Sequence, residues 1–454
     1  MNRIAGRTTI TVLFALLLVI GLAFFVAEYV LEADEWIVST GSPHIYNAGN
    51  IGTGTVVDRS GALLLDMEGE WTYASTESLR KSTLHWLGDR GGYISAPALA
   101  NYSAELSGYD MLSGLYTYGH NSGVATLTLS AEVQKAALAA MGDYKGTVAV
   151  YNYKTGEILC AVTTPTYDPD NIPDFTEDPT GKYMGVYLNR FTQSVYIPGS
   201  IFKIVTLAAA LETVDDIEEQ HFKCSGSYTV GSDEITCEKV HGDQTLQEAF
   251  RNSCNCAFAQ ITLQVGAEEM ERYVELFGVT QPVRFDGIKT ATGNYEALGT
   301  ADANVAWSGI GQYKDQVNPC AFLNFVGAIA GDGKGVESYI VSKIQVGSNT
   351  TYSASTTAGK RIISTVTAKT IKEYMRANVV EKYGDNNFGK LNVSAKTGTG
   401  EVGGDQKPNA MLAGFVQNEE YPLAFIVFVE DGGYGREICV PIAAKVLDAC
   451  KKIM

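Results

Sequence analysis

Ser200 and Lys203 are the first residues in this sequence whose types and spacing could carry out a reaction. They lie in the segment YIPGSIFKIVTLAAAL, which is apolar almost all round from Ser200 to Leu211 and predicts a buried central helix there. Residues three apart share one face of a helix, so the lysine amine can reach the serine hydroxyl. Burial disfavours a charged ammonium and so lets a neutral lysine act as a base on serine. Taken alone, S-x-x-K is common by chance and favours a helix cap over a nucleophile.

Two further polar motifs follow along the chain. Ser253 and Asn255 lie in a helical region, where a hydroxyl and a carboxamide separated by one residue could relay a proton and bind a peptide carbonyl or amide. At the end of a strand-like run, KTGT (396–399) offers a lysine and two threonines that could hold a substrate carboxylate. Its glycine lets a substrate backbone approach closely. Taken alone, each motif is more typical of a polar turn than of a functional site.

Together, the S-x-x-K, S-x-N and K-T-G motifs, in this order, resemble the signature of penicillin-binding proteins and serine β-lactamases. The flanking segments NRFTQSVYIPGSIFKIVTLAAALE, HGDQTLQEAFRNSCNCAFAQ, GEILCAVTTPTYDPD and KPNAMLAGFV are similar to landmarks of class B penicillin-binding proteins. The nearest similarity is to the short-pedestal group related to penicillin-binding protein A and the FtsI-like division transpeptidases. It implies a peptidoglycan D,D-transpeptidase that cross-links stem peptides and is inhibited covalently by β-lactam antibiotics.

The resemblance also implies a role for each motif residue. Ser200 would attack the penultimate D-Ala of a D-Ala-D-Ala stem peptide and release the terminal D-Ala, with Lys203 as its general base. Ser253 would pass the proton to the leaving amine, and Asn255 would bind the substrate amide. The backbone N–H of Thr399 would complete the oxyanion hole with that of Ser200. The third motif would otherwise hold the carboxylate end of the substrate, and it consists of Lys396, Thr397, Gly398 and Thr399.

The elements that must position these residues follow from the hydrophobic pattern. Five strand-like runs occur, namely GTVAVYN, EILCAVT, LNVSAKTGT, MLAGFVQ and LAFIVFVE, and the first two are joined by the turn 153–156 into a predicted hairpin. In the helical middle, Thr245 and Glu248 have capping-box spacing, while Gly266 and Gly278 fit as helix ends. This order predicts an α+β fold, an antiparallel sheet covered by helices with a helical subdomain. The resemblance implies the same transpeptidase fold, with an N-terminal transmembrane helix and a small pedestal.

An uncharged apolar run, Ile10–Ala27, opens the chain and is long enough to cross the hydrocarbon core of a membrane. Arg3 and Arg7 precede it and acidic residues follow it, so the positive-inside rule leaves the N-terminus cytoplasmic and the catalytic part outside. A cleavable signal peptide is the competing interpretation, but no convincing small-x-small site follows the run. We therefore expect an uncleaved single-pass anchor in the cell membrane.

The chain divides into three predicted parts. These are a cytoplasmic tip and anchor (1–29), a turn-rich pedestal or linker domain (30–122) and a transpeptidase domain (123–454). About 90 residues before the catalytic module cannot hold a second enzyme, so a bifunctional glycosyltransferase-transpeptidase is excluded. Glycan strands would have to be polymerised by a partner. The resemblance suggests a multi-span glycosyltransferase of the division or elongation machinery that contacts the anchor and the pedestal.

The net charge of −17 limits the classes of partner that we expect. Nucleic acid is not expected, because a phosphate backbone is bound by a surplus of lysine and arginine. The same sign argues against broad electrostatic binding to an anionic membrane surface, so attachment depends on the hydrophobic segment. No cofactor is expected.

Eight cysteines occur, and two of them are placed to interact. Cys224 and Cys237 bracket CSGSYTVGSDEITC, a predicted hairpin that a disulfide could close in an exported protein, although two free thiols are equally compatible. Cys237 and His241 offer two zinc ligands, but no paired ligand spacing supports a site, and we expect no metal. Histidines are expected to have structural or surface roles, because none falls in a motif; they are His44, His85, His120, His221 and His241.

Other proteins could use the same site. A D,D-carboxypeptidase or a β-lactamase would transfer the acyl group to water, and acceptor choice depends on groove shape that sequence does not show. Class A β-lactamases use a glutamate for deacylation, whereas Cys320 stands where an E-x-x-L-N pattern ending at Asn324 would place it. A β-lactam sensor would usually need several membrane spans, and a non-catalytic scaffold would be expected to lose a catalytic group, yet all are present.

Overall fold

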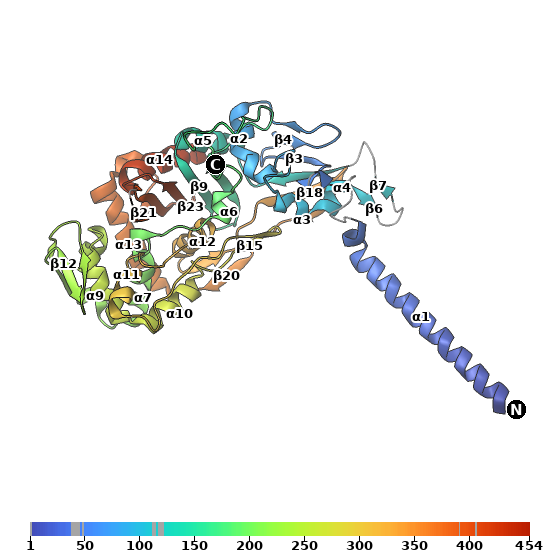
Figure 1. The fold of residues 1–454 in the computed structure, drawn as a ribbon, viewed down its shortest axis with the longest axis horizontal. Coiled ribbons are helices and arrows are strands. Elements are labelled where there is room, and N and C mark those ends of the chain that lie inside the picture. Colours follow the sequence, from blue (N-terminus) through green and yellow to red (C-terminus); the bar gives the residue numbers. More distant parts are fainter. Residues whose placement is uncertain are drawn as a thin grey trace.

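A computed structural model of the chain describes residues 2–37, 46–47, 50–110, 115–116, 122–389, 391–404 and 406–454. The N-terminal helix α1 (Asn2–Ile37) projects away from the rest of the molecule (Figure 1). Within the described ranges, Gly6–Val30 is the one stretch long and apolar enough to cross a membrane, and its most apolar window is not buried. The predicted apolar helix is thus confirmed, and it fits a single-pass membrane anchor. His44, His120 and parts of the predicted pedestal lie outside the described residues.

A five-stranded antiparallel sheet lies at the centre of the larger part of the molecule, with the order β10-β9-β23-β22-β21. Its strands are β9 (Lys145–Asn152), β10 (Ile158–Thr164), β21 (Val393–Gly400), β22 (Asn409–Val416) and β23 (Leu423–Glu430). The predicted hairpin of the first two runs and the three late strands are therefore confirmed. The late strands pair with the early hairpin through β9 and β23, which leaves β21 at one edge.

Helices cover both faces of this sheet, as the α+β prediction requires (Figure 1). The covering helices are α5 (Ala131–Met141), α12 (Pro319–Ala330) and α14 (Gly435–Ile453). Successive side chains of a strand point to opposite faces. Val427 of β23 accordingly lies in one core with Val446 of α14, whereas its neighbour Ile426 lies in the other core with Phe325 of α12. Burial of both faces explains why these strands read as continuous apolar runs.

A helical region packs beside the edge strand β21 and forms the predicted helical subdomain. Its helices are α7 (Lys203–Thr213), α8 (Leu246–Arg251), α9 (Asn255–Val265), α10 (Ala267–Phe277), α11 (Asp302–Ser308) and α13 (Thr365–Asn378). The capping box predicted at Thr245 is present, with its side chain and that of Glu248 each accepting from the other residue's backbone N–H. Gly266 and Gly278 end α9 and α10 as predicted.

A second, six-stranded sheet has the order β19-β18-β8-β3-β4-β5. Its strands are β3 (Thr55–Val57), β4 (Leu63–Asp66), β5 (Thr72–Tyr73), β8 (Gly123–Leu127), β18 (Val341–Val346) and β19 (Asn349–Ser353). Its helical neighbours in the sequence are α2 (Glu77–Leu87), α3 (Pro97–Asn101) and α4 (Ser103–Ser107). The short strands β3, β4 and β5 are too small to form a sheet alone, and they join β8 and β18, which lie beyond position 122. The division at 122/123 stays a prediction.

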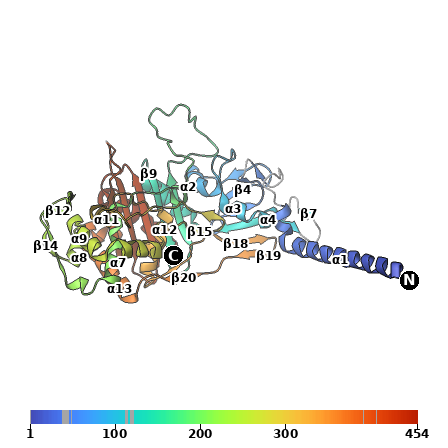
Figure 2. The same cartoon turned by 60° about the horizontal axis from the view of Figure 1, so that its bottom comes forward.

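Short elements connect these layers. Figure 2 shows β12 and β14 beside α8 and α9, at the end of the molecule opposite α1. The remaining elements are β1 (Tyr46–Asn47), β2 (Asn50–Ile51), β6 (Tyr109–Asp110), β7 (Leu115–Tyr116), α6 (Arg190–Gln193), η1 (Gly199–Ile201), η2 (Ile217–Glu219), β11 (His221–Cys224), β12 (Ser227–Val230), β13 (Asp233–Thr236), β14 (Gly242–Thr245), β15 (Arg284–Phe285), β16 (Ile288–Lys289), β17 (Lys334–Val336), β20 (Ala358–Arg361), the π-helix η3 (Val379–Tyr383) and η4 (Asp385–Phe388).

Candidate active site

Ser200 lies in the short 3-10 turn η1, not in the helix predicted from position 200, because α7 begins only at Lys203. The turn is packed directly against the edge strand. Gly199 has φ +51°, and a Cβ added there would lie 2.1 Å from the carbonyl oxygen of Thr399. The N–H of Gly199 also donates to the carbonyl of Gly311 at 2.8 Å. Only glycine fits this approach, which holds the half-buried Ser200 at the edge of β21.

Lys203 lies one helical turn from Ser200 and is completely buried. Its Nζ is 3.1 Å from the Oγ of Ser200 and 2.7 Å from both the carbonyl oxygen of Ser253 and the Oδ1 of Asn255. The ring of Phe258 lies 5.7 Å away. Among the described residues, no carboxylate is paired with this amine. Burial therefore lowers the pKa of Lys203 to about 8, which makes a neutral amine accessible beside the serine.

Ser253 joins the two lysines of the site. Its φ of +54° is uncommon for a residue other than glycine, and such strain is often found at functional positions. The Oγ of Ser253 accepts from the Nζ of Lys396 at 2.9 Å and lies 3.3 Å from the Nζ of Lys203. The residue thus forms a polar link between both amines. Position 254 caps α9, and Asn255 begins that helix.

The third motif forms the end of β21, with its side chains divided between the cleft and the interior. Lys396 is buried, and its Nζ donates to Ser253 and to the carbonyl of Thr397 at 3.0 Å. Burial, and then the nearby charge of Lys203, hold the pKa of Lys396 well below its usual range. Thr397 and Thr399 are half-buried and line the cleft. The structure thus places Lys396 behind Ser253, and its predicted direct contact with a substrate carboxylate stays a prediction.

Tyr383, the last residue of the π-helix η3, is a site residue that the sequence did not indicate. Its hydroxyl oxygen accepts from the backbone N–H of Thr397 at 3.1 Å and lies 3.1 Å from that residue's Oγ1. It therefore fixes the orientation of the threonine that faces the cleft. No motif surrounds Tyr383 in the sequence, and only the fold brings it to the edge strand.

The cleft above these residues has a volume of about 970 Å³, at the upper end of the range for ligand sites. Ser200, Ser253 and Asn255 lie on its wall, so the structure brings the three predicted motifs together in one place. Other wall residues come from distant segments that sequence reasoning missed: Trp307, Ile310, Tyr313, Tyr434 and Arg436.

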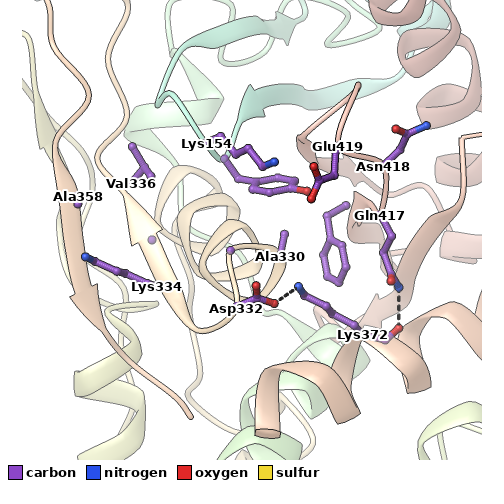
Figure 3. A pocket seen from close by; sticks show the side chains of 14 residues that line it. Lys154, Ala330, Asp332, Lys334, Val336, Ala358, Lys372, Gln417, Asn418 and Glu419 are labelled. Carbon is purple, nitrogen blue, oxygen red and sulfur yellow. Dashed lines mark hydrogen bonds and ion pairs between the residues drawn. The ribbon is translucent and has the colours of Figure 1, made fainter. Parts of the chain in front are cut away.

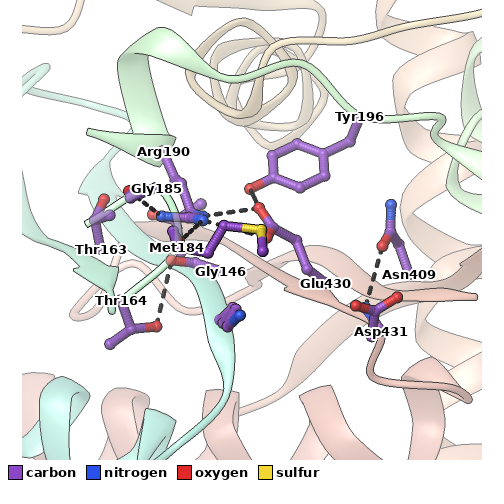
Figure 4. Close-up of polar contacts among 12 residues, drawn as sticks. Gly146, Thr163, Thr164, Met184, Gly185, Arg190, Tyr196, Asn409, Glu430 and Asp431 are labelled. Carbon is purple, nitrogen blue, oxygen red and sulfur yellow. Dashed lines mark hydrogen bonds and ion pairs between the residues drawn. The ribbon is translucent and has the colours of Figure 1, made fainter. Parts of the chain in front are cut away.

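A buried ion pair supports the segment that leads to Ser200 (Figure 4). The Nε of Arg190 donates to Glu430 at 2.8 Å, and its Nη1 donates to the carbonyl of Gly185 at 2.8 Å. The hydroxyl of Tyr196 donates to the same carboxylate at 3.1 Å. Glu430 ends β23, so this pair ties the chain just before the nucleophile to the central sheet. Its groups are mutually satisfied and are not placed for chemistry.

A second cavity, of about 500 Å³, lies near the opposite end of β22 (Figure 3). Lys154, Lys334 and Lys372 line it, and Lys372 forms an ion pair with Asp332 at 2.5 Å. Its described lining includes no serine, threonine or cysteine that could serve as a nucleophile. The cleft at Ser200 is therefore the candidate active site.

Comparisons with known proteins agree with this geometry. The penicillin-binding protein transpeptidase domain model matches residues 146–448. The peptidoglycan D,D-transpeptidase PbpA of Mycolicibacterium smegmatis is 29% identical over 332 residues, which cover 67% of this chain and 67% of that protein. Stage V sporulation protein D of Bacillus subtilis is 29% identical over 321 residues, covering 66% of this chain and 48% of that protein.

The fold is similar to that of solved structures as well. The penicillin G acyl-enzyme complex of penicillin-binding protein A from M. tuberculosis aligns with a TM-score of 0.74 and 22% sequence identity. The alignment covers 88% of this chain and 99% of that chain. The central sheet, its helical layers and the smaller sheet are thus an architecture shared with that protein.

Proposed function

The chain belongs to the penicillin-binding protein transpeptidase family, and from this premise we propose that it is a serine-type peptidoglycan D,D-transpeptidase that acylates on Ser200. One observation carries the assignment of the residues. The Oγ of Ser200, the amine of Lys203, the Oγ of Ser253 and the amine of Lys396 form a continuous polar chain at the base of a large cleft. Such a chain can take a proton from a nucleophile and deliver it to a leaving group.

Acylation begins with a neutral Lys203 that accepts the proton of Ser200 across the 3.1 Å contact. The serine oxygen attacks the carbonyl carbon of the penultimate D-Ala and forms a tetrahedral intermediate. Backbone N–H groups of Ser200 and Thr399 are proposed to stabilise its oxyanion. The C–N bond to the terminal D-Ala then breaks, Ser253 passes a proton to the departing amine, and an ester on Ser200 remains.

Transfer of the acyl group to a second stem peptide completes the catalytic cycle. The amine of a second stem peptide attacks the ester carbonyl, a new amide forms, and Ser200 recovers its proton through the same polar chain. A β-lactam follows the first step alone, because its leaving nitrogen stays tethered to the acyl group after ring opening. The tethered group occupies the position of the acceptor amine. β-Lactam antibiotics therefore act as covalent inhibitors of this site.

Substrate binding is assigned to the cleft-facing groups of the motifs. Asn255 binds the backbone amide of the stem peptide, while Thr397 and Thr399 hydrogen-bond its carboxylate end. Gly398 is proposed to let the substrate backbone approach closely. An added Cβ there would also lie 2.9 Å from the side chain of Ile201, in the turn that carries Ser200. Lys396 lies behind Ser253, to which its amine donates at 2.9 Å, and its direct contact with the substrate carboxylate stays a prediction.

We place the catalytic part outside the membrane, with residues 1–29 as the cytoplasmic tip and the transmembrane anchor. Arg3 and Arg7 before the apolar helix support this orientation. The pedestal (30–122) and α1 are proposed to contact a multi-span glycosyltransferase that supplies glycan strands. Co-purification of that glycosyltransferase with the full chain, and its loss when α1 is replaced by an unrelated membrane helix, would support this contact. Unchanged co-purification would contradict it.

A fluorescent penicillin tests the function directly. Detergent-solubilised full chain should acquire a persistent covalent label that is absent from Ser200→Ala and retained by Ser232→Ala, a matched change at an exposed turn. With a pentapeptide donor and an amine acceptor, the product should be a cross-linked peptide with release of D-Ala. Absence of label on folded wild type would refute the assignment. Rapid loss of label with drug hydrolysis would instead indicate a β-lactamase, and tetrapeptide as the sole product a carboxypeptidase.

A further inference from the structure

Four side chains that acyl transfer does not use lie together at one wall of the cleft. Cys224 ends β11, Cys237 follows β13, His241 precedes β14, and Cys254 caps α9. Their sulfur and ring nitrogen atoms all lie within 4.8 Å of one another. Two of the residues are buried and two are half-buried. Three thiols and an imidazole that converge in this way are the ligand set of structural zinc sites.

Three separations among these atoms match the edges of a tetrahedron around one zinc ion. The Nδ1 of His241 is 3.5 Å from the Sγ of Cys224 and 3.4 Å from the Sγ of Cys237. The Sγ atoms of Cys237 and Cys254 are 3.8 Å apart. Zinc bonds of about 2.3 Å to sulfur and about 2.0 Å to nitrogen give tetrahedral edges of about 3.8 Å between sulfurs and about 3.5 Å from sulfur to nitrogen. We propose that these four residues bind a zinc ion as a closed structural site.

The backbone around the four ligands needs such a cross-link. β11 pairs with β14, and β12 pairs with β13, as two separate two-stranded ladders between α7 and α8. Most side chains of β12 and β13 are exposed or half-buried, so this excursion has little apolar core of its own. Isolated two-stranded hairpins are marginally stable in water. A metal that joins both ladders to the start of α9 supplies stabilisation that packing does not.

Backbone donors around the sulfurs favour thiolates there. The N–H of Ala257 donates to the Sγ of Cys254 at 3.4 Å, in the first turn of α9. The free N–H groups at the start of a helix stabilise negative charge, which is the form in which cysteine binds a metal. No carboxylate belongs to the described group of four, and the soft ligands favour zinc over calcium or magnesium.

The sequence pattern explains why this site was not expected. The ligands follow C-x12-C-x3-H-x12-C, which lacks the short paired spacings by which zinc sites are usually identified. Long gaps arise because each ligand lies at the end of a different strand or helix. A disulfide between Cys224 and Cys237, the other arrangement considered from the sequence, would leave Cys254 and His241 without a role. One zinc ion uses all four groups.

The position of Cys254 gives the metal a consequence for the cleft. Cys254 lies between Ser253, whose backbone is strained, and Asn255. The Nδ2 of Asn255 donates to the carbonyl of Thr236 at 3.0 Å, and Thr236 precedes the ligand Cys237. A metal bond to Cys254 fixes the residue that follows Ser253. A metal bond to Cys237 fixes the residue next to Thr236, the hydrogen-bond partner of Asn255. We assign the four ligands as positioning residues for Ser253 and Asn255, a role that goes beyond acyl transfer itself.

Metal content of the full chain, purified in detergent under reducing conditions without chelator, tests the site. Plasma mass spectrometry should find one zinc ion per chain in wild type and in Cys439→Ser, whose buried cysteine in α14 lies outside the group. Cys237→Ser with His241→Gln should lose the metal. Replacement by cobalt should give the visible and near-ultraviolet bands of a tetrahedral thiolate site. Failure of wild type to retain zinc, stoichiometric zinc in the double variant, or a disulfide among the three cysteines would each overturn the site.

The positioning role is tested on wild type by removing the metal, so it does not depend on variants that fold. Chelation should slow acylation by a fluorescent penicillin about 10- to 100-fold, and added zinc should restore it. An unchanged acylation rate after complete removal would overturn this role. The metal measurement is independent of acyl transfer: a zinc-loaded chain that does not label would contradict the proposed function and leave the zinc site standing.

Discussion

The cleft at Ser200 and the cavity at Lys372 both contain lysines, but in opposite settings. Lys372 forms an ion pair with Asp332, whose side chain is 64% exposed (Figure 3). Lys203 and Lys396 are buried, and the described structure pairs neither with a carboxylate. Removing a lysine from water without a counter-charge favours its neutral form. Both cavities contain lysines, so lysine alone does not distinguish them. The cleft differs because its buried lysines have no paired carboxylate among the described residues.

Arg190 provides the case between these two. It is as deeply buried as the cleft lysines, with 5% of its side chain exposed, yet Glu430 compensates its charge. A guanidinium does not lose its proton at any ordinary pH, so the pair serves to hold the chain together. Breaking a buried ion pair is strongly destabilising because the remaining charge has no partner. Arg190 thus has a counter-charge, whereas the two buried lysines of the cleft have none among the described residues.

The comparison predicts its largest effect at Lys203. Replacement by methionine keeps the length and apolar stem of the side chain but removes the base, so acylation by a fluorescent penicillin should slow by about 10²- to 10⁴-fold. Stopped-flow measurement of label incorporation checks this value. Lys372→Met is the matched control, because it removes a lysine of the same length from the other cavity. Equal losses in the two variants would show that partner-free burial is not what distinguishes the cleft.

The second prediction concerns pH. In the proposed mechanism Lys203 acts in its neutral form, and its pKa of about 8 lies below that of an ordinary lysine. Protons leave this amine as pH rises, so acylation should increase about tenfold per pH unit below pH 8 and level off above it, about a hundredfold in total from pH 6. The rate constant measured across this range, with unfolding monitored in parallel, provides the test. A rate that is flat from pH 6 to 9 would exclude Lys203 as the titrating base.

A smaller effect is expected at Tyr383, which supports the cleft without touching the reacting atoms. Tyr383→Phe removes the oxygen that accepts from the N–H of Thr397, so that donor loses its partner. Loss of one hydrogen bond of this kind corresponds to about 1 kcal/mol, or about a fivefold slower acylation. Tyr144→Phe, at an exposed tyrosine, is the control. If Tyr383→Phe acylates at the wild-type rate, Thr397 does not depend on this support.

Much of the site could be predicted from the sequence because its residues lie in short, ordered motifs. Ser200 and Lys203 share a local turn and helix, and Lys396 follows a strand-like run in which apolar residues alternate, so local patterns placed them. Tyr383 could not be predicted in this way, since its contact with Thr397 depends on how a π-helix packs against the edge strand. The same holds for the ligands around Cys237, which meet only after two ladders fold back on α9.

The fold was predictable to a similar degree. The five strands of the central sheet read as apolar runs because helices cover both of its faces. The smaller sheet was only partly visible, because β18 and β19 enter it from a segment more than two hundred residues away from β3. Their partly exposed strands carry little hydrophobic signal. A local sequence pattern cannot predict pairing between distant strands that have few apolar residues.

The smallest effect belongs to the second cavity. Asp332→Asn breaks the ion pair with Lys372. Because Asp332 is exposed, this change should lower the free energy of unfolding by only about 0.2 to 1 kcal/mol. Acylation should stay within about twofold of wild type. Thermal unfolding and the penicillin rate check both expectations. The backbone carbonyl of Lys372 accepts from Ser394 of β21 at 3.2 Å, so α13 offers a physical connection between cavity and cleft. A tenfold slower acylation in Asp332→Asn would mean that this connection transmits the change, and the two cavities would then have to be treated as one coupled unit.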